Sequence, residues 1–427
     1  MPYTVILKRN EEKRIAAGHP WVYANEVARI EGKDANGSVA VVRDASGRFL
    51  GKGFINHLSK ILVRILTRRE EEIDREFFLN RIREAAEYRK KLGFSDSCRL
   101  VFAEADGLPA LIVDKYHDIL CAQFLSLGMD QRKDMICGCL KELFSPRGIY
   151  ERSDVAVRAK EGLKLVKGWM LPPCPGTVPE KSGDTGVKSE FGDSMGADTG
   201  KKSEDSEGTG ADTVVEIEEN GLIMRVDLEN GQKTGYFLDQ KENRFALRRY
   251  AAGAEVLDCF SNVGGFSVNA AAAGAKSVLA VDISRTALDE VEKNAARNGF
   301  SEIVSTLCGD VFEVLREFKK NGRSFDLVVL DPPAFCKSAS EVRDACRGYK
   351  DINVLGLKLV KPGGFLVTSS CSHYMTFPLF ERMLSDAARD SGRIVRTVEL
   401  RAQSPDHPSL LAAEETQYLK FVVLHVK

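Results

Sequence analysis

Two strand-like segments in the C-terminal half lead into residues that can do chemistry. GGFLVTSS leads directly to Cys371, and FDLVVL leads to the run Asp331-Pro332-Pro333. A thiolate that adds to C6 of a cytosine makes C5 reactive enough to take a methyl group, after which a base removes the C5 proton and the thiol leaves. A carboxylate on a stiff proline loop can recognise the amine and ring nitrogen of such a planar base. The pattern therefore favours Cys371 as a nucleophile, with Asp331 and Pro332 beside it.

The other thiols suggest no second centre. The chain has ten cysteines, and none has the paired spacing of a zinc site, so we predict no metal. In a reducing compartment thiols stay free, so a cysteine that matters here is expected to be catalytic rather than structural. Cys336, just past the proline loop, is the rival or helper thiol. Cys259 is expected to pack in a turn, and His373 to be a solvated or hydrogen-bonded loop residue rather than a base.

A glycine-containing turn, DCFSNVGGF at 258–266, follows the first apolar segment of this half. Its glycines allow the backbone to approach a ligand closely, but it lacks the GxGxxG that seats a dinucleotide pyrophosphate. Asp258 suits a ligand that bears an amino acid and a sulfonium, as S-adenosylmethionine does, and Asp282 can accept bonds from ribose hydroxyls. Asp310 can reach toward an adenine or cap a helix. The cofactor residues predicted from these segments are Asp258, Phe260, Ser261, Gly264, Gly265, Phe266, Asp282, Ile283, Asp310, Val311 and Asp331.

A sheet has to hold these residues together. From about residue 214 apolar runs of strand length (EVLDCF, SVLAVDI, FDLVVL and GGFLVTSS) alternate with helical runs such as SRTALDEVEKNAARNG. Buried strands that alternate with helices predict an α/β fold with a doubly wound parallel sheet. Ligands of such sheets bind at the carboxyl ends of the strands, where the residues above stand.

The rest of the chain divides by pattern. Residues 1–70 read as short strands separated by turns, a small β domain, and 71–172 as a helix followed by a compact α+β domain. Residues 173–213 are rich in Gly, Ser, Asp and Pro, which predicts a disordered or loop insertion. Residues 214–427 form the last domain.

Composition and charge narrow the class of protein. With 43% hydrophobic and 29% charged residues among 427, the chain reads as an ordinary globular protein, and it has no apolar run of membrane-span length. No signal peptide is recognisable, so we expect a cytoplasmic protein without a membrane partner. Residues 1–70 hold 13 Lys and Arg against 7 Asp and Glu. This excess suits a nucleic-acid partner, although an ordinary solvated surface explains it equally well.

Taken together, these motifs resemble the large-subunit ribosomal RNA 5-methylcytosine methyltransferase I family of Rossmann-fold RNA methyltransferases. The resemblance spans nearly the whole chain outside 173–213. The matching segments are GHPWVY (18–23), EADGLP (104–109), IYERSD (149–154), QKTGYFLDQ (232–240), the DCFSNVGGF turn, DPPAF, CRGYKDIN (346–353) and SSCS.

The resemblance implies an N-terminal PUA domain, a central α+β domain and an S-adenosylmethionine-dependent methyltransferase domain. It implies ribosomal RNA as substrate and Cys371 as nucleophile. KTGYFLDQ looks like the family's strand leading into the cofactor site, which adds Tyr236 to the cofactor residues. The family often has Lys where Ala334 stands, and the 173–213 insertion is outside its pattern.

The sequence leaves several other functions possible. Methylation of a guanine or of an exocyclic nitrogen needs no thiol, so Cys371 disfavours it. A silent RNA-binding assembly factor would not need Asp258, Asp282 and Asp331. A nicotinamide dehydrogenase is disfavoured by the missing GxGxxG. A homodimer is compatible with the sequence, which does not identify the target nucleotide.

Overall fold

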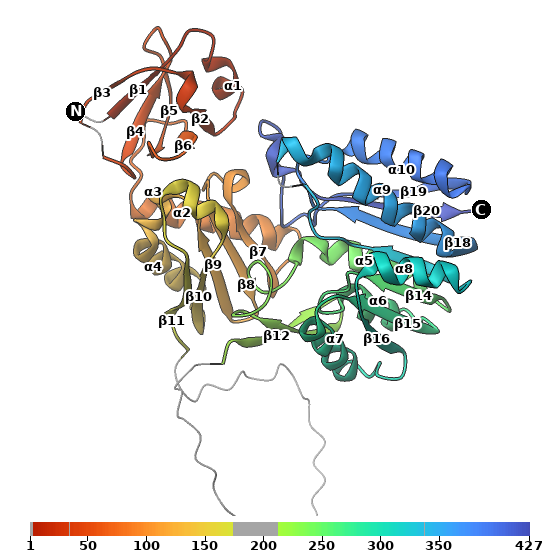
Figure 1. The fold of residues 1–427 in the computed structure, drawn as a ribbon. Helices are drawn as coiled ribbons and strands as arrows, with labels where there is room; N and C mark the ends of the chain where they lie inside the picture. Colours follow the sequence, from red (N-terminus) through yellow and green to blue (C-terminus); the bar gives the residue numbers. More distant parts are fainter. Residues whose placement is uncertain (1–2, 34, 174–211, 337) are drawn as a thin grey trace, which may run out of the picture.

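The computed structural model describes residues 3–33, 35–173, 212–336 and 338–427. Apart from its two ends, the segment predicted as an insertion, 173–213, lies outside these ranges. The chain forms an N-terminal, a central and a C-terminal sheet in sequence order (Figure 1). Within the described ranges, no helix is both long and apolar enough to cross a membrane.

The N-terminal sheet has six strands in the order β2-β6-β5-β4-β1-β3. Its apolar side chains, among them Val5, Val42 and Val63, form a core of their own. The apolar runs TVILK, SVAVVR, FLGKGFI and ILVRILT of the predicted β domain correspond to β1, β4, β5 and β6. β2, which is three residues long, and β3, which carries charged side chains, were not expected. The elements are β1 (Tyr3–Leu7), α1 (Glu12–Ala16), β2 (Trp21–Tyr23), β3 (Val27–Glu31), β4 (Val39–Arg43), β5 (Phe49–Ile55) and β6 (Ile61–Thr67).

The central sheet has the order β11-β10-β9-β8-β7, and two helices, α2 and α4, pack on it. Helix α2 starts where Asp74 accepts a hydrogen bond from the backbone N of Phe77 at 3.0 Å, an N-cap that satisfies a free helical donor. The elements are α2 (Arg75–Lys91), β7 (Ser97–Phe102), β8 (Leu111–Tyr116), β9 (Ile119–Phe124), α3 (Leu127–Asp130), α4 (Lys133–Phe144), β10 (Gly148–Ser153) and β11 (Val166–Leu171).

A hairpin joins the central and C-terminal parts. Its strands β12 (Val214–Glu219) and β13 (Leu222–Asp227) bury alternate residues, as expected for strands with one covered face. Val215 and Met224 of the hairpin share a core with Tyr116 of the central sheet and with Val268 of the C-terminal part. The hairpin therefore ties the two parts together through buried apolar surface.

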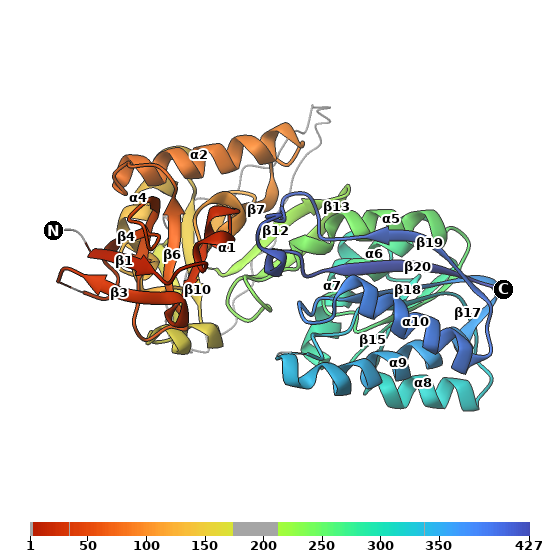
Figure 2. The ribbon, with the colours of Figure 1, turned by 90° about the horizontal axis from the view of Figure 1, so that it is seen from above.

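The C-terminal sheet has seven strands in the order β16-β15-β14-β17-β18-β20-β19. Adjacent residues of its strands face opposite sides: Val328 packs with α8, α9 and α10, whereas Val329 packs with α5, α6 and α7. Figure 2 shows these helices on the two sides of the sheet. The elements are α5 (Lys241–Ala251), β14 (Glu255–Cys259), α6 (Gly265–Ala272), β15 (Ser277–Asp282), α7 (Arg285–Arg297), β16 (Val304–Cys308), α8 (Val311–Lys320), β17 (Phe325–Leu330), α9 (Val342–Leu359), β18 (Val360–Ser370), α10 (Phe377–Ser391), β19 (Val395–Arg401) and β20 (Lys420–Val426).

The α/β class is confirmed, but the sheet is mixed rather than wholly parallel. Strands β14 to β18 pair in parallel, whereas β20 pairs antiparallel with both β18 and β19. Neither strand was predicted from the sequence. β19 is an edge strand whose residues are exposed or half-buried, whereas β20 is a buried apolar run that went unassigned.

Residues 402–419, between β19 and β20, form what we call the crossover segment. They contact the N-terminal, central and C-terminal parts of the chain. Asp406 accepts from Arg99 of the central sheet, with its carboxylate at 2.9 Å from the backbone N. Glu415 lies 3.5 Å from His19 of the N-terminal part, and the backbone N of Ser404 donates to Asp239 in the C-terminal part.

Candidate functional site

A pocket of about 150 Å³ opens at the carboxyl ends of β14, β15, β17 and β18. Predicted site residues from separate segments meet in its wall. They are Tyr236, Phe260, Ser261, Gly265, Phe266, Asp282, Asp331, Pro332 and Cys371. The remaining predicted residues, Asp258, Gly264, Ile283, Asp310 and Val311, lie outside the wall.

The turn after β14 has an unusual backbone. Phe260 and Asn262 have positive φ angles, +62° and +49°, a conformation that costs free energy for residues with a side chain. At Gly265 an added Cβ would lie 2.7 Å from Arg244 Cδ, so a side chain there would displace Arg244. The turn thus carries its backbone and the Phe260 ring into the pocket wall.

Asp282 is fixed at the end of β15. One carboxylate oxygen accepts from the backbone N of Asn262 at 2.9 Å and the other from Ser284 N at 2.9 Å. Each oxygen keeps a second lone pair, so the carboxylate can still accept bonds from ribose hydroxyls. It also neutralises part of any cation bound in the pocket.

Asp258 lies beneath the turn and is fully buried. It does not line the pocket, whereas it was predicted from the sequence as a cofactor residue. Its carboxylate accepts from Ser267 Oγ at 2.6 Å, and burial raises its pKa to about 7. Asp258 therefore supports the turn. Asp310 similarly caps α8, where its side chain accepts from Phe312 N at 2.8 Å.

Asp331 follows β17 and faces the pocket beside Pro332. Its Oδ1 accepts from Gln240 Nε2 at 2.9 Å and from Ser369 Oγ. Burial raises its pKa to about 6, against the effect of the Ser369 hydrogen bond. The group therefore exchanges a proton within the neutral range more readily than an exposed carboxyl.

Cys371 follows β18 directly and lines the same wall as Asp331. Burial raises the pKa of its thiol to about 11; Lys233 and Lys420 oppose this, whereas Asp331 and Asp239 add to it. Lys420 donates to the backbone O of Ser372 at 2.5 Å, next to Cys371. The two ammonium groups are the charges that favour a thiolate here.

Among the described cysteines, only Cys371 lines the pocket. Cys336 is 3% exposed, and its thiol donates to the backbone O of Ser338 at 3.1 Å. Cys259 lies in the core, as predicted. His373 is not in the wall either.

Three charged residues of the wall, Lys233, Asp239 and Arg244, were not predicted from the sequence. Lys233 Nζ lies 3.0 Å from Asp239 Oδ2 and 4.4 Å from the centre of the Phe237 ring. Arg244 forms a buried two-bond ion pair with Glu219 at 2.6 and 2.7 Å. The KTGYFLDQ motif contains Lys233 and Asp239, so it could have indicated them. The strand predicted for this motif is wrong, because residues 231–237 form a loop that ends in a 3₁₀ turn.

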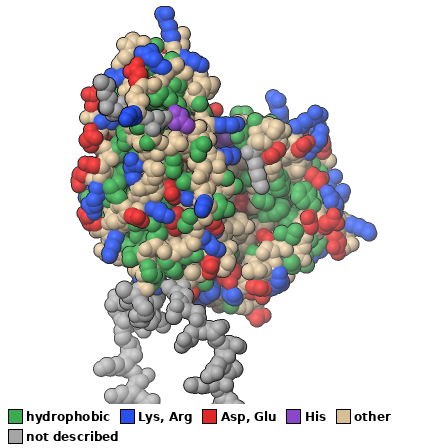
Figure 3. Space-filling model, turned by 60° about the vertical axis from the view of Figure 1, so that its left-hand side comes forward, with side chains coloured by type: hydrophobic (Ala, Val, Ile, Leu, Met, Phe, Trp, Pro, Cys, Tyr) green, Lys and Arg blue, Asp and Glu red, His purple; other side chains and the backbone are tan. Residues whose placement is uncertain are grey.

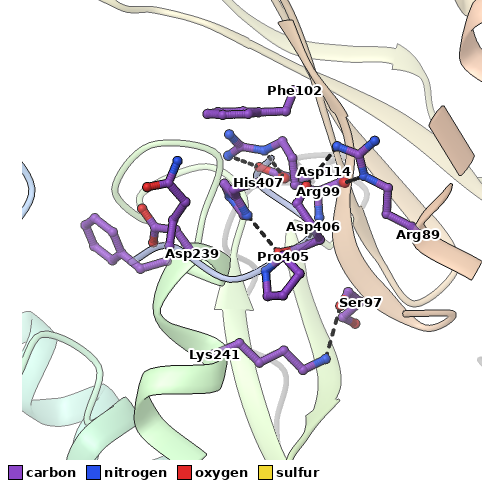
Figure 4. Close-up of polar contacts among 12 residues, drawn as sticks. Arg89, Ser97, Arg99, Phe102, Asp114, Asp239, Lys241, Pro405, Asp406 and His407 are labelled. Atoms are coloured by element: carbon purple, nitrogen blue, oxygen red, sulfur yellow. Dashed lines mark hydrogen bonds and ion pairs between the residues drawn. The ribbon is translucent and has the colours of Figure 1, made fainter. Parts of the chain in front are cut away.

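The central sheet holds this loop from outside. Thr234 Oγ1 donates to Asp114 Oδ2 at 2.5 Å and lies 2.9 Å from the Tyr116 hydroxyl. Asp114 also accepts two bonds from Arg99, at 2.5 and 2.9 Å. Figure 4 shows Arg99 between Asp114 and Asp406 of the crossover segment. The loop that carries Lys233 therefore rests on a buried network of another part of the chain.

The pocket fits S-adenosylmethionine chemically. Three carboxylates, Asp239, Asp282 and Asp331, face a volume that also has aromatic walls, which suits a ligand with a sulfonium and an ammonium group. Ser261 Oγ is buried and has no hydrogen-bond partner in the part of the chain that the structure describes, so a polar ligand group can satisfy it.

Comparison with known proteins agrees with this chemistry. A family model described as S-adenosylmethionine-dependent methyltransferase matches residues 202–422, and a PUA-like domain model matches residues 5–68. A ribosomal RNA large subunit methyltransferase I from Aeromonas salmonicida is 39% identical, with all of both chains covered. One from Shewanella amazonensis is 40% identical, again over both whole chains.

Solved structures show the same fold over the full length. A putative methyltransferase from Streptococcus mutans matches with a TM-score of 0.78 at 20% identity, and a putative methyltransferase complexed with SAH matches with 0.79 at 19% identity, each covering all of both chains. The chain therefore belongs to the S-adenosylmethionine-dependent methyltransferases and, within them, to the ribosomal RNA large subunit methyltransferase I family.

Proposed function

We propose that this enzyme methylates C5 of a cytosine in large-subunit ribosomal RNA through a covalent adduct on Cys371. The observation that carries the proposal is the position of Cys371 in one pocket wall with Asp331 and Asp282. Methyl transfer to a nitrogen needs no thiol at this place. The ribosomal RNA substrate follows from the names of the full-length relatives.

Bound S-adenosylmethionine supplies an electrophilic methyl group. Asp282 holds the ribose, while the carboxylates of Asp239 and Asp331 favour the ligand's positive charge in a partly buried site. Phe260 and Phe266 exclude water from the apolar side of the pocket. These residues bind and orient the donor and take no covalent part.

The covalent step belongs to Cys371. Its sulfur forms a bond to C6 of the cytosine, the C5–C6 electrons move toward C4, and N3 takes up a proton. The resulting enamine carbon, C5, takes the methyl group, whose bond to the sulfonium breaks to leave S-adenosylhomocysteine. A base then removes the C5 proton, the C5–C6 double bond forms again, the sulfur leaves as a thiolate, and N3 gives up the proton that it took, so that neutral 5-methylcytosine is released.

In this mechanism Asp331 exchanges the N3 proton. Because its pKa is raised to about 6, part of the population carries a proton near neutral pH and can donate it as C6 is attacked. Pro332 and Pro333 restrict the backbone next to it, which keeps the carboxyl group in place.

The high pKa of Cys371 means that the resting enzyme holds a thiol. Lys233 and Lys420 stabilise the thiolate once the proton has left.

The test is bisulfite sequencing of large-subunit ribosomal RNA from a strain that lacks the gene and from its parent. We expect one cytosine to resist conversion in the parent and to convert in the deletion strain. Complementation with the wild-type gene should restore resistance, and a Cys371→Ala gene should not. Identical conversion patterns in deletion and parent would contradict the cytosine assignment and move a guanine or an exocyclic nitrogen to first place.

A further inference from the structure

A second cavity, of about 320 Å³, lies where the N-terminal part, the central part and the crossover segment meet. Its wall includes Trp21 and Arg64 from the first, Phe102 and Val157 from the second, and Glu415 from the third. We call it the junction cavity. Nothing in the methyl-transfer chemistry uses it.

The junction cavity combines aromatic and apolar surface with charged side chains. Trp21 and Phe102 contribute rings, and Ile61, Ile112 and Leu125 contribute aliphatic surface. Such a lining favours a flat and largely apolar group over a hydrated ion, because burying a full charge is costly. Nucleobases stack well on aromatic side chains.

Two polar atoms of wall residues lack hydrogen bonds among the described residues. Arg64, whose side chain is 10% exposed, has an unpartnered Nε donor, although its Nη2 lies 2.9 Å from Glu161. Glu415 Oε2 is a buried acceptor without a close hydrogen bond among the described residues; it lies 3.5 Å from Nε2 of His19, whose pKa burial lowers. Buried polar groups usually find partners, so the free Arg64 donor and the weakly paired Glu415 acceptor in one wall suit a ligand edge that offers both. The edge of a nucleobase has this character.

The neighbourhood suits a sugar-phosphate backbone. An adjoining hollow of about 260 Å³ shares Glu104 with the junction cavity and is lined by Arg68, Arg69 and Arg81. On the face drawn in Figure 3, basic and acidic side chains are interspersed. Guanidinium groups beside an aromatic cavity are the combination that single-stranded nucleic acids require.

The crossover segment links the junction cavity to the methyl-transfer pocket. Glu415 and Thr416 line the first and Leu419 lines the second, so at most about 14 Å of extended chain separates them. Between them the Tyr418 hydroxyl donates to Asp239 at 2.6 Å, and its ring lies 6.3 Å from that of Phe102. A strand of a few nucleotides can reach both cavities.

We propose that the junction cavity binds a second, unmethylated nucleobase of the RNA strand whose target base enters the Cys371 pocket. The inference rests on RNA being the substrate. Stacking against Trp21 and Phe102 and hydrogen bonds to Arg64 and Glu415 hold this base. The site thereby fixes the register of the strand and contributes to the choice of target.

Trp21 provides a direct probe. The chain has two tryptophans, and Trp169→Phe leaves Trp21 as the only emitter. This change keeps a ring against Tyr150 and removes an indole N–H that has no hydrogen-bond partner within the described ranges, so the fold should tolerate it. Short single-stranded RNA should quench Trp21 emission saturably, and an abasic strand of equal length should not. Unchanged emission while RNA binds, measured by anisotropy, would overturn the proposal.

A second variant fills the cavity. Val157 is 39% exposed at its wall, so Val157→Phe adds a ring there with little strain on the core. We expect RNA binding to weaken by about 5- to 100-fold, the scale of one stacked base, with unchanged affinity for S-adenosylmethionine. The matched control, Leu165→Phe, adds a ring at a position that is 59% exposed and outside the cavity, and should bind RNA normally.

The outcomes separate this proposal from the proposed function. If wild-type enzyme methylates ribosomal RNA and Val157→Phe binds RNA like the control, the base site is refuted and the methyltransferase assignment stands. If wild-type enzyme neither binds nor methylates ribosomal RNA, both proposals fail together.

Discussion

The substitution Thr234→Val tests whether the central sheet positions the methyl-transfer pocket. Thr234 is fully buried, and its hydroxyl donates to the Asp114 carboxylate at 2.5 Å. Valine has nearly the same shape, so the change leaves no cavity and removes only the hydroxyl. Hydrogen bonds to charged groups contribute about 1.5–3 kcal/mol.

This loss falls on the loop that carries Lys233 and Tyr236 into the pocket wall. If the whole loss of about 2 kcal/mol destabilises the loop conformation that binds the ligand, the affinity for S-adenosylmethionine falls roughly 30-fold. Isothermal calorimetry measures this affinity. We therefore expect a decrease of between a few-fold and about 30-fold, because the remaining bonds of the Arg99–Asp114 pair still hold part of the network.

The matched control is Thr306→Val. Thr306 also donates to a carboxylate, Glu292 at 2.6 Å, but both groups are exposed and lie outside the pocket wall. It should leave affinity and activity at the wild-type level. If Thr234→Val also bound S-adenosylmethionine like wild type, the central sheet would not position this loop.

Three further outcomes are expected. Asp282→Ala should weaken S-adenosylmethionine binding by about 1–3 kcal/mol in calorimetry, whereas Asp289→Ala, on the exposed side of α7, should not; equal affinities would remove Asp282 from the cofactor site. The pKa of Asp258 is raised to about 7, so the stability that it contributes is present below the ordinary carboxyl pKa and is lost as the pH rises to about 7. Asp258→Asn should therefore flatten the pH dependence of the free energy of unfolding, measured in urea, over this range. An unchanged pH dependence would contradict a protonated, buried Asp258. Lys233→Met removes a charge that favours the Cys371 thiolate, so the pH dependence of adduct formation should move to higher pH; an unchanged profile would show that Lys233 does not act on the thiol.

Strand ends were the most informative feature of the sequence. The carboxyl ends of neighbouring parallel strands meet at one edge, so the predicted strands were enough to bring Asp282, Asp331 and Cys371 to one place. Asp258 shows the limit of this reasoning. Successive side chains of a strand point to opposite faces, and the sequence alone did not show that Asp258 would be buried beneath the turn.

The missed residues depend on contacts between distant segments. Lys233 and Asp239 lie in a loop without periodicity, and their place in the wall depends on Asp114 and Tyr116, more than 110 positions earlier. The crossover segment likewise carries no strand or helix pattern. Its arrangement follows from buried hydrogen bonds to Arg99 and Asp239 that no local sequence window contains.

The most direct test of the central claim is covalent trapping on RNA that carries 5-fluorocytosine at the target site. Fluorine at C5 cannot leave as a proton, so the Cys371 adduct should accumulate and survive denaturing electrophoresis. Wild-type enzyme and Cys336→Ala should trap the RNA, because Cys336 lies outside the pocket wall. Cys371→Ala should trap none while it still binds S-adenosylmethionine. Trapping by Cys371→Ala but not by Cys336→Ala would show that Cys336, not Cys371, is the nucleophile. If an active wild-type enzyme trapped no RNA, the cytosine mechanism would be contradicted.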